Sequence, residues 1–534
     1  MPTVKENALE WSLKHLTRYY DSDFYPKSFE FEAIASNWPS VKDYVLSLDL
    51  LKYTPKSPVI SLAPKPNGTY RIVHKLDPID SLIFTALVYE LHQIIEGYRI
   101  PASENIACSY RIKPDVNGSF FDRDENGWKN YKRRIKKLSR KYKDGYVITC
   151  DITDFYNQIY THRLQNIISE AGGGEFDEQA YILHEFLLKL NTKTSRGIPV
   201  GPAASIVLAE AIMADIDKKI LSYTRDFTRW VDDIIIYFKK KEDALFVFHE
   251  LTKYLHSIHT LVFSGEKSRT VTVKRFLKRY FKDEEKEEEI VILRKTEELA
   301  KEEFEKLDID ISPYGSYDEE TEEALEEEYE RIYNEVAENE QFKILSKAYR
   351  EILKKSVDSN KLDVPLLRRI LRNATKYRIR SIVPIVLKNF EFFIPVIREI
   401  IIYLNKVLSA KLIERHKKYF EIILDSSIMR FPFINMWISH LLHNKHFDAF
   451  DLPSNYEKIS QIRDQALLAR RRKDRVWIKG YKDGLDVLGP WDRRAILYSS
   501  DILSRDEMEH WIKLVSSKGD IVDKSICTLL LSKS

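Results

Sequence analysis

The sequence is poor in cysteine and has no long apolar stretch. Only three cysteines occur in 534 residues, at Cys108, Cys150 and Cys527. Their odd number and wide spacing exclude a disulfide framework and a zinc ribbon, and they are typical of a reducing compartment. No apolar run approaches the ~20 residues of a membrane span, and the charged N-terminus lacks the apolar core of a signal peptide. We therefore expect a cytoplasmic protein with no membrane partner.

Several common site signatures are absent as well. The chain has no P-loop, no nicotinamide fingerprint and no paired-cysteine motif. It does have enough apolar mass for true cores, since 44% of its residues are hydrophobic and 31% are charged. Its length exceeds that of one ordinary domain and predicts about two to four domains.

The net charge of +3 conceals a strong asymmetry along the chain. Residues 283–340 carry 25 acidic and 6 basic side chains, which leaves a net charge of +22 on the remainder. A body that basic suits a polyanionic partner, most simply nucleic acid. The acidic segment is typical of a polar insert, with solvated helices on either side of "SPYGSYD"; an autoinhibitory mimic of nucleic acid is the alternative.

The chain up to about residue 280 mixes helices and strands. Residues 1–60 are predicted as an N-terminal helical extension. The stretch "SLAPKPNGTYRIVHKL" alternates apolar residues around Pro66-Asn67-Gly68 and predicts a β-hairpin. Beyond it we expect a helix over residues 81–97, a strongly basic helix in "NYKRRIKKLSRKYK" and a buried strand in "GYVITCDI". Two further helices bracket the loop "TKTSRGIPVGP".

From about residue 342 onward the strand signals mostly vanish. Apolar helices with recurrent prolines follow, as in "VPLLRRIL", "SIVPIVLKNF" and "FFIPVIREIIIYL". This spacing favours a HEAT-like α-solenoid, and a non-repetitive helical domain is the alternative. The expected fold class is therefore α+β over residues 61–280, followed by an acidic helical insert or linker over 281–341 and an all-α domain over 342–534.

The stretch "TRWVDDIIIYF" places two adjacent carboxylates, Asp232 and Asp233, between apolar flanks. β-Branched and aromatic residues favour strands on both sides, so the two acids are predicted at the tip of a β-hairpin. They form either a turn that happens to be acidic or a metal site whose cation offsets their repulsion.

A third carboxylate ends another apolar strand. In "VITCDITDFY", Asp151 comes directly after the strand and is followed by Asp154, Phe155 and Tyr156. A lone acid at a strand end is usually a helix cap, but neighbouring strand ends can bring Asp151 and Asp232 together. Hard oxygen ligands of this kind suit two Mg²⁺ ions, which retain waters and bind substrate phosphates. Such a pair, ~4 Å apart, can activate a primer hydroxyl and stabilise the leaving oxygen of a phosphoryl transfer.

In this order the motifs resemble the palm of reverse transcriptases, over roughly residues 60–280. Asp151 with "FY" resembles the first catalytic motif, and "GIPVGPAASIVLAEAIMADID" resembles the glycine-containing motif that opens the following helix. "WVDD" stands where that family has tyrosine, any residue, Asp-Asp, and "LVFSGEKSRT" matches the next motif, with Lys267. Upstream, "PKPNGTYR" resembles the fingers hairpin.

The resemblance implies an antiparallel palm sheet and catalytic roles for four residues. Asp151 and Asp232 would ligate both metal ions, with Asp233 as the weaker, supporting acid. Mg²⁺ is the expected ion and Mn²⁺ the alternative. Lys267 would either donate a proton to pyrophosphate or only orient phosphates.

The resemblance also implies a set of residues around the incoming nucleotide. Lys65 and Arg71 would hold its triphosphate; ordinary surface charges are the alternative. Tyr156 stands where the family's bulky gate excludes a 2′-hydroxyl, which implies dNTPs, although a packing aromatic also fits. Close backbone approach to the substrate is expected at Gly197, Pro199 and Gly201.

Three departures from the family pattern are visible. Val200 replaces the glutamine usual in "GxPQG", near the template–nucleotide pair, and Trp230 replaces the tyrosine before "xDD", beside the primer end. Both leave the metal ligands intact and put ordinary template–primer handling in doubt. The third departure is the helical array in place of a small thumb.

A palm followed by HEAT-like helices is similar to the abortive-infection (Abi) and related unknown-group defence reverse transcriptases of bacteria. That resemblance implies phage defence, homo-oligomers and DNA synthesis started from a protein tyrosine, and it gives no way to choose among the 30 tyrosines. Some such enzymes make single-stranded DNA without a conventional template, and others use a noncoding RNA. A non-catalytic nucleic-acid-binding scaffold and an RNA polymerase are further alternatives; the intact acids and Tyr156, respectively, argue against them.

Weaker signals are three basic clusters and a histidine run. The clusters are residues 132–143, 274–282 and 470–482, and the last two interleave aromatics with cations, as a single-strand groove would. Solvated helix faces are the alternative. His440, His443 and His446 recur at three-residue intervals, which permits a metal site, but histidines at a helix end are the commoner explanation.

Overall fold

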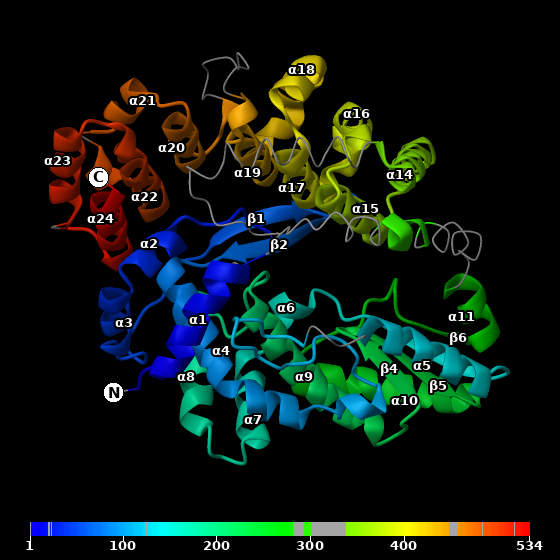
Figure 1. Ribbon diagram of the computed structural model, residues 1–534. Coiled ribbons are helices and arrows are strands. Elements are labelled where there is room, and N and C mark those ends of the chain that lie inside the picture. Colours follow the sequence, from blue (N-terminus) through cyan, green and yellow to red (C-terminus); the bar gives the residue numbers. More distant parts are fainter. Residues whose placement is uncertain are drawn as a thin grey trace. The chain divides into compact units, whose positions relative to one another are not determined.

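The computed structural model describes residues 2–19, 22, 24–122, 127–280, 293, 295–300, 338–447, 458–482, 484–516 and 518–533. They fall into two compact units, drawn in Figure 1. Unit 1 comprises Met1–Ile60, Ile72–Lys282 and Gly519–Lys533, and unit 2 comprises Ser61–Arg71 and Asp283–Lys518. The predicted acidic insert, residues 281–341, lies almost wholly outside the described residues.

A four-stranded antiparallel sheet forms the centre of unit 1. Its strands are β3 (Tyr146–Cys150), β4 (Phe227–Trp230), β5 (Asp233–Phe238) and β6 (Arg269–Thr272), in the order β4-β5-β3-β6. The two central strands, β3 and β5, are apolar on both faces, as expected of strands covered on both sides. The predicted antiparallel palm sheet is confirmed.

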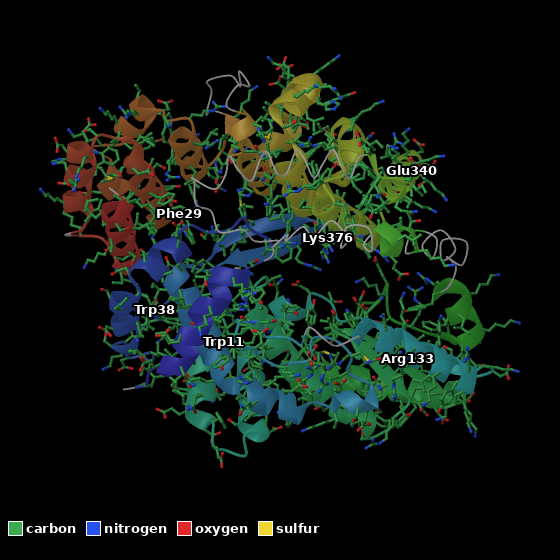
Figure 2. All side chains as sticks on the ribbon, viewed as in Figure 1. Trp11, Phe29, Trp38, Arg133, Glu340 and Lys376 are labelled. Atoms are coloured by element: carbon green, nitrogen blue, oxygen red, sulfur yellow. The ribbon has the colours of Figure 1, made fainter. Side chains whose placement is uncertain are left out.

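Helices make up most of the rest of unit 1. Those of unit 1 are α1 (Glu6–Tyr19), α2 (Glu30–Ser36), α3 (Trp38–Leu46), α4 (Pro78–Tyr98), α5 (Gly127–Lys141), α6 (Phe155–Gln158), α7 (Thr161–Ala171), α8 (Asp177–Leu190), α9 (Ala203–Leu221), α10 (Lys241–Tyr254), α11 (Val273–Tyr280) and α24 (Ile521–Lys533). The N-terminal extension is helical, as predicted, and it packs on the body through Trp11 (Figure 2), whose indole N–H donates to the Asp115 carbonyl at 2.8 Å.

The long helix α4 begins where the sequence stops favouring strand. Asp77 caps it by accepting the Ile79 N–H at 3.2 Å, and Pro78 occupies the first turn, where its missing N–H costs nothing. Most of its first half is buried, and it contacts α1, α7, α8 and α9. It therefore ties the N-terminal helices to the rest of unit 1.

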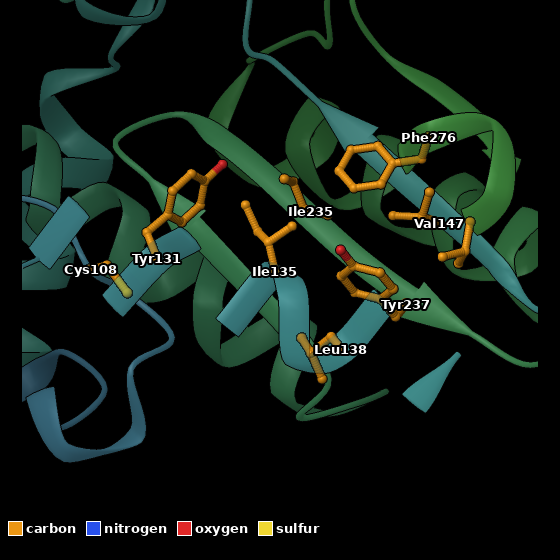
Figure 3. Close-up of a cluster of buried hydrophobic side chains, with 9 residues drawn as sticks. Cys108, Tyr131, Ile135, Leu138, Val147, Ile235, Tyr237 and Phe276 are labelled. Carbon is orange, nitrogen blue, oxygen red and sulfur yellow. The ribbon is translucent and has the colours of Figure 1, made fainter. Parts of the chain in front are cut away.

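One face of the sheet is covered by α5 and α11. Tyr131, Ile135 and Leu138 recur along α5 at intervals of four and three, so they share one side of the helix. With Phe276 of α11 they pack on Val147, Ile235 and Tyr237 of β3 and β5 (Figure 3). Because side chains alternate along a strand, Ile148, Ile234 and Ile236 point to the opposite face, where they are also buried.

The C-terminal helix α24 belongs to unit 1, whereas the sequence division put residues 342–534 into one domain. It lies beside α2 (Figure 1), and the Asn37 amide donates to the Ser525 hydroxyl at 3.1 Å. Lys533 forms an ion pair with Glu32 at 2.9 Å. Lys56 forms another with Asp520 at 2.6 Å, just before the helix. The predicted bounds of the four domains stay predictions.

The predicted upstream hairpin is confirmed as β1 (Val59–Pro64) and β2 (Tyr70–Lys75), which form a two-stranded sheet. At its turn the Lys65 N–H donates to the Thr69 carbonyl at 2.8 Å, and Gly68 has a left-handed φ of 76°. The tip, Ser61–Arg71, is grouped with unit 2.

Unit 2 is helical in the residues that the structure describes after residue 337. Its α-helices are α14 (Glu340–Asp358), α15 (Val364–Lys376), α16 (Val383–Lys388), α17 (Ile397–Val407), α18 (Ala410–Asp425), α19 (Pro432–Leu442), α20 (Ile462–Arg471), α21 (Arg475–Lys479), α22 (Pro490–Tyr498) and α23 (Arg505–Ser516). None of the helices in the described ranges is long and apolar enough to cross a membrane.

Alternate helices of unit 2 pack in two rows. One row is α14, α16 and α18, and the other is α15, α17 and α19 (Figure 1). Prolines begin four of the helices, α15, α16, α19 and α22, because proline lacks only an N–H that the first turn does not use. Stacked helical pairs are typical of solenoids; the HEAT-like repeat itself stays a prediction.

The histidine run is part of this helical core. His440 and His443 are half-buried with their ring centroids 6.0 Å apart, and desolvation lowers their pKa values to about 4 and about 3. No group of three or more His, Cys, Asp or Glu side chains within the described ranges is placed to hold a metal ion. The metal alternative for His440, His443 and His446 therefore gains no support from the described residues.

Candidate active site

The two adjacent acids lie where the sequence places them, at the tip of a hairpin. Trp230, the last residue of β4, pairs with Asp233, the first of β5, so Val231 and Asp232 form the connecting turn. Val231 has a left-handed φ of 53°, a costly conformation for a β-branched residue. Surrounding contacts must hold this turn in place.

The sheet register brings the third acid to the same point. β3 and β5 are antiparallel with Cys150 opposite Ile234, so the next residues, Asp151 and Asp233, lie across from each other. Lys267 then joins them, because its ammonium group donates to Asp151 Oδ1 at 3.0 Å. The main chain of Asp151 is fixed by the same loop, with its carbonyl accepting the Ser264 N–H at 2.7 Å. All four predicted catalytic residues are therefore neighbours.

The electrostatics of this cluster are those of crowded negative charge. Burial and then the charges of Asp233 and Asp151 raise the pKa of Asp232 to about 6. Desolvation and the charge of Asp151 likewise raise the pKa of Asp233 to about 6. Desolvation alone would lower the pKa of Lys267, but its bond to Asp151 and the carboxylate charges outweigh this and raise it.

Hard oxygen donors that repel one another fit a divalent cation, which would relieve the repulsion. As the side chains stand, the described part of the chain contains no ready group of three or more His, Cys, Asp or Glu ligands. Lys267 instead neutralises Asp151 directly. The support for a metal role of Asp151, Asp232 and Asp233 thus comes from the carboxylate oxygens and from their crowded charge, and not from a preformed ligand group.

The glycine-containing loop lies against the predicted sugar gate. The Ile198 N–H donates to the Tyr156 carbonyl at 3.0 Å, and the Gly197 N–H donates to the Ile159 carbonyl at 2.8 Å. Tyr156 itself is half-buried on the short helix α6, next to the buried ring of Phe155. The structure thus brings Tyr156 together with the loop that holds Gly197, Pro199 and Gly201.

Gly201 is required by both conformation and space. Its φ is +134°, and a Cβ added there would lie 2.4 Å from the Ser22 hydroxyl oxygen. The preceding residue, Val200, is buried, and its N–H and carbonyl both bond to His74, at 3.0 and 2.9 Å. The side chain that replaces the usual glutamine is therefore packed inside the protein.

Lys65 and Arg71 lie at opposite ends of the β1–β2 turn. Lys65 is half-buried and Arg71, in β2, is exposed. Both belong to unit 2, whereas the carboxylates belong to unit 1. Their role toward a triphosphate stays a prediction.

Sequence reasoning missed a buried ionic network behind the hairpin. Arg229 of β4 is fully buried, and its guanidinium bonds to Asp217 at 2.8 Å and Glu210 at 2.9 Å, both on α9. It also donates to the Val231 carbonyl at 3.0 Å. Ser109 completes the network by donating to Glu210 at 2.9 Å and accepting the Val231 N–H at 2.8 Å.

This network holds both polar groups of the strained Val231 peptide, so it sets the direction of the acid-bearing turn. A signal for it was present in the sequence. Glu210 and Asp217 are seven residues apart in a mostly apolar helix, which puts both on one face, and Arg229 interrupts an apolar strand. Charges are rarely buried without a partner.

The family comparison agrees with this geometry. Residues 63–310 match the family model described as reverse transcriptase (RNA-dependent DNA polymerase). The chain contains a reverse transcriptase domain. A domain of this kind is a nucleotidyltransferase of the RNA-directed DNA polymerase type, and the match spans every residue predicted to act, from Lys65 to Lys267. No curated protein matches the chain.

Solved structures similar to the chain include three telomerases. One is telomerase from Candida albicans in complex with the TWJ fragment of telomeric RNA, at 9% identity and a TM-score of 0.30, covering 75% of this chain and 64% of that one. Another is apo telomerase from Candida tropicalis, at 11% identity and a TM-score of 0.31, covering 80% of this chain and 73% of that one. The third is Candida tropicalis telomerase in complex with the TWJ fragment of telomeric RNA, at 11% identity and a TM-score of 0.30, covering 80% of this chain and 67% of that one.

The reverse transcriptase domain is thus placed by the family model and by its own motifs. The chain covers less than two thirds, 64%, of the length of the first telomerase. At such TM-scores the telomerases support no inference about this chain.

Proposed function

We propose that this protein is a DNA polymerase of the reverse-transcriptase type that acts in antiphage defence in the bacterial cytoplasm. It extends a DNA strand with dNTPs, starts from a tyrosine of the protein itself, and works without a conventional template. The observation that carries the polymerase activity is the meeting of Asp151, Asp232 and Asp233 with Lys267 at one edge of the palm sheet, inside a reverse transcriptase domain.

The cluster suits phosphoryl transfer. When bound, two Mg²⁺ ions supply activation of the primer hydroxyl and charge stabilisation on the leaving oxygen. Asp151 and Asp232 hold them, and Asp233 supports from the start of β5. Lys267 is placed 3.0 Å from Asp151, where its ammonium group can orient phosphates once the carboxylate is engaged elsewhere.

The substrate is assigned from the residues near the loop. Tyr156 is held beside the Gly197–Gly201 backbone, so its ring can exclude a 2′-hydroxyl and favour dNTPs over NTPs. Lys65 and Arg71 supply a point charge and a bidentate fork for the triphosphate. A gate that excludes the 2′-hydroxyl would hinder an RNA polymerase, because every NTP carries that group.

The defence role rests on the combination of this domain with a helical unit. Alternate rows of helices in unit 2 are compatible with the HEAT-like array of the defence enzymes. Membership of that class would mean that the protein forms homo-oligomers and starts DNA synthesis from one of its own tyrosines. A dedicated noncoding RNA as template is the alternative, and copurifying RNA of one sequence would favour it.

The test is to incubate the purified full chain with Mg²⁺ and each labelled dNTP, with no template or primer, and to run a denaturing protein gel. Label that migrates with the protein, is removed by DNase, and is absent in an Asp232→Asn, Asp233→Asn variant is the expected result. Asp243→Asn, an exposed acid on α10, is the matched control and should label normally.

Two other outcomes would change or overturn the proposal. Labelling that requires copurified RNA would replace untemplated synthesis with the noncoding-RNA alternative. No label from any preparation, with or without RNA and primers, would overturn the polymerase proposal and leave a nucleic-acid-binding scaffold.

A further inference from the structure

A ledge of aromatic rings runs from the protein surface to the acid-bearing hairpin. Trp128, near the start of α5, is 47% exposed, and its ring meets the edge of Trp230 at 4.9 Å between centroids. Tyr110 is 40% exposed, and its ring centroid lies 6.4 Å from that of Trp230. Trp230 itself pairs with Asp233 across the hairpin. Exposed clustered aromatics of this size are typical of a binding surface.

The helix that begins at this ledge is strongly basic. α5 contains no acidic residue, and its exposed cations include Lys129, Arg133, Lys136, Lys137 and Arg140 (Arg133 is labelled in Figure 2). The neighbouring helix α11 also contains no acidic residue and exposes Lys274, Arg275, Lys278 and Arg279. Two basic helices side by side provide a charged track for a polyanion.

Both helices lie on the face of the sheet toward which Asp151 and Asp233 point. α5 and α11 pack on Val147, Ile235 and Tyr237 (Figure 3). Asp233 precedes Ile235 by two residues, and Asp151 follows Val147 by four, so strand alternation turns both acids toward this face. The ledge, the basic helices and the acids are thus arranged around one surface.

The start of α5 is held close to the hairpin by its glycine. A Cβ added to Gly127 would lie 2.3 Å from the Cys108 carbonyl oxygen and 3.5 Å from the Trp230 ring. Only glycine allows this approach, which sets Trp128 against Trp230. The ledge therefore depends on a specific backbone contact.

We propose that this ledge, Trp128, Tyr110 and Trp230, together with the exposed cations of α5 and α11, binds a single-stranded nucleic acid and leads its 3′ end to the carboxylates. Bases stack on the rings while the basic helices follow the phosphates. In a duplex the base faces are stacked inside the helix, so a duplex would be held only by the attraction between its phosphates and the cations. The assignment of the strand as the growing product rests on the proposed function; the binding does not.

The other aromatic and basic cluster of the sequence, residues 470–482, is a weaker candidate. Its cations are engaged within unit 2: Arg470 with Asp501, Arg475 with the Ile502 carbonyl, and Lys479 with Glu507 at 2.5 Å. These contacts hold helices together and leave less charge for a ligand.

The test is a fluorescence-anisotropy titration of the full chain, without dNTPs or metal, against labelled dT20, rU20 and a 20-base-pair DNA duplex. Trp128→Ala should weaken binding of the single strands about tenfold, since loss of one stacked base is worth roughly 1–3 kcal/mol, and should leave the duplex nearly unchanged. Tyr181→Ala, an exposed aromatic of α8, is the matched control and should bind like the wild type.

A second variant tests the charge term independently of the aromatic packing. Arg133→Gln with Lys137→Gln should reduce the slope of log K against log salt by about 1.4 for single strands, at roughly 0.7 per phosphate contact. Lys241→Gln with Lys253→Gln on α10 should leave that slope unchanged. Similar melting temperatures would show that all variants fold.

The outcomes separate the binding site from the polymerase activity. Tighter binding of dT20 identifies a DNA strand, tighter binding of rU20 identifies RNA, and either supports the site. Equal effects of Trp128→Ala and Tyr181→Ala, or an unchanged salt slope, would overturn it. If binding behaves as expected while dNTP incorporation is absent, the proposed function fails and the binding site stands.

Discussion

At the scale of single residues, the site depends on charges that have been taken out of water. Arg229 is fully buried between Glu210 and Asp217, and the cost of burying it is offset by five hydrogen bonds to their carboxylates. The remaining donor of the guanidinium reaches the Val231 carbonyl. The network thus fixes the orientation of the turn that holds Asp232.

Ser109 tests this positioning role, because it links the network to the Val231 N–H. Ser109→Ala should lower kcat about tenfold and leave the KM for dNTP nearly unchanged, since the turn moves and the nucleotide pocket does not. The cost in stability should be about 1–2 kcal/mol, from the lost hydrogen bonds. Steady-state kinetics and urea unfolding provide both readouts.

Ser81→Ala is the matched control. Ser81 is equally buried, on α4, and its hydroxyl has no hydrogen-bond partner within the described structure. It should change neither kcat nor KM. A parallel fall in kcat for both variants would mean that Ser109 acts only through general stability.

The sugar gate is a second test at this scale. Tyr156→Ala should raise incorporation of rNTPs relative to dNTPs by at least about tenfold, because the space for a 2′-hydroxyl opens. Tyr156→Phe keeps the ring and should keep the discrimination. Single-nucleotide incorporation assays measure both ratios, and equal ratios for wild type and Tyr156→Ala would refute the gate.

At the scale of elements, the site is built where three connections meet. The β4–β5 turn supplies Asp232, the end of β3 supplies Asp151, and the loop before β6 supplies Lys267. A fourth connection, the loop before α9, is fixed to Tyr156 and to His74 through its backbone. Changes in that loop should therefore affect substrate binding without moving the acids.

Gly201→Ala is expected to do this. The new Cβ would meet the Ser22 side chain at 2.4 Å in a left-handed conformation, so the loop must shift. The KM for dNTP should rise by about tenfold or more. Gly173→Ala, with a φ of +59° and no atom within 4 Å of the added Cβ, is the control for the conformational cost alone and should leave KM unchanged.

At the scale of the whole molecule, unit 1 is closed by residues from opposite ends of the chain. Lys56 bonds to Asp77 at 3.1 Å and to Asp520 at 2.6 Å, and α24 then packs along α2. Next to them, Asp80 is buried and accepts the Tyr53 hydroxyl at 2.6 Å and the Lys56 N–H at 2.9 Å. This acidic group makes the stability of the unit sensitive to pH.

Burial, and then the charge of Asp77, raise the pKa of Asp80 to about 7. A carboxyl with a pKa higher in the folded than in the unfolded state binds more protons when folded, so it lowers stability as pH rises from about 4 to about 7. Its contribution to the slope is at most about 1.4 kcal/mol per pH unit. Urea unfolding between pH 5 and 8 should show this fall.

Asp80→Asn should flatten that dependence, while Asp243→Asn on exposed α10 should reproduce the wild-type curve. The absolute stability of Asp80→Asn should also decrease at pH 5, because one amide group now faces the Lys56 N–H. An unchanged slope in Asp80→Asn would assign the pH dependence to other groups.

Much of the site was predictable because short stretches of sequence determine its strands and turns. Apolar runs interrupted by Asp-Asp, and a strand that ends in an acid, predict strand ends with carboxylates, and motif order then predicts the palm. The β4–β5 hairpin and the upstream β1–β2 hairpin followed from turn residues and alternation. These features need only neighbours in sequence.

Other features could not be predicted, because they depend on which distant segments meet. Nothing local says that Arg229 bonds across to Glu210 and Asp217 of α9, or that Trp128 packs edge-to-face on Trp230 after a separation of about one hundred residues. The return of α24 to α2 joins the ends of the chain, and no pattern within either helix indicates the other.

The sequence by itself determined the chemistry: the carboxylates, the basic body, the glycines at Gly197 and Gly201, and the change from strands to helices. Only the tertiary structure decided the placement. It closed a strained turn on a buried arginine, set two basic helices on the face toward which Asp151 and Asp233 point, and brought the half-buried rings of His440 and His443 together. The reason is physical: propensity and alternation act over a few residues, whereas charge pairing and burial are settled only when distant segments pack together.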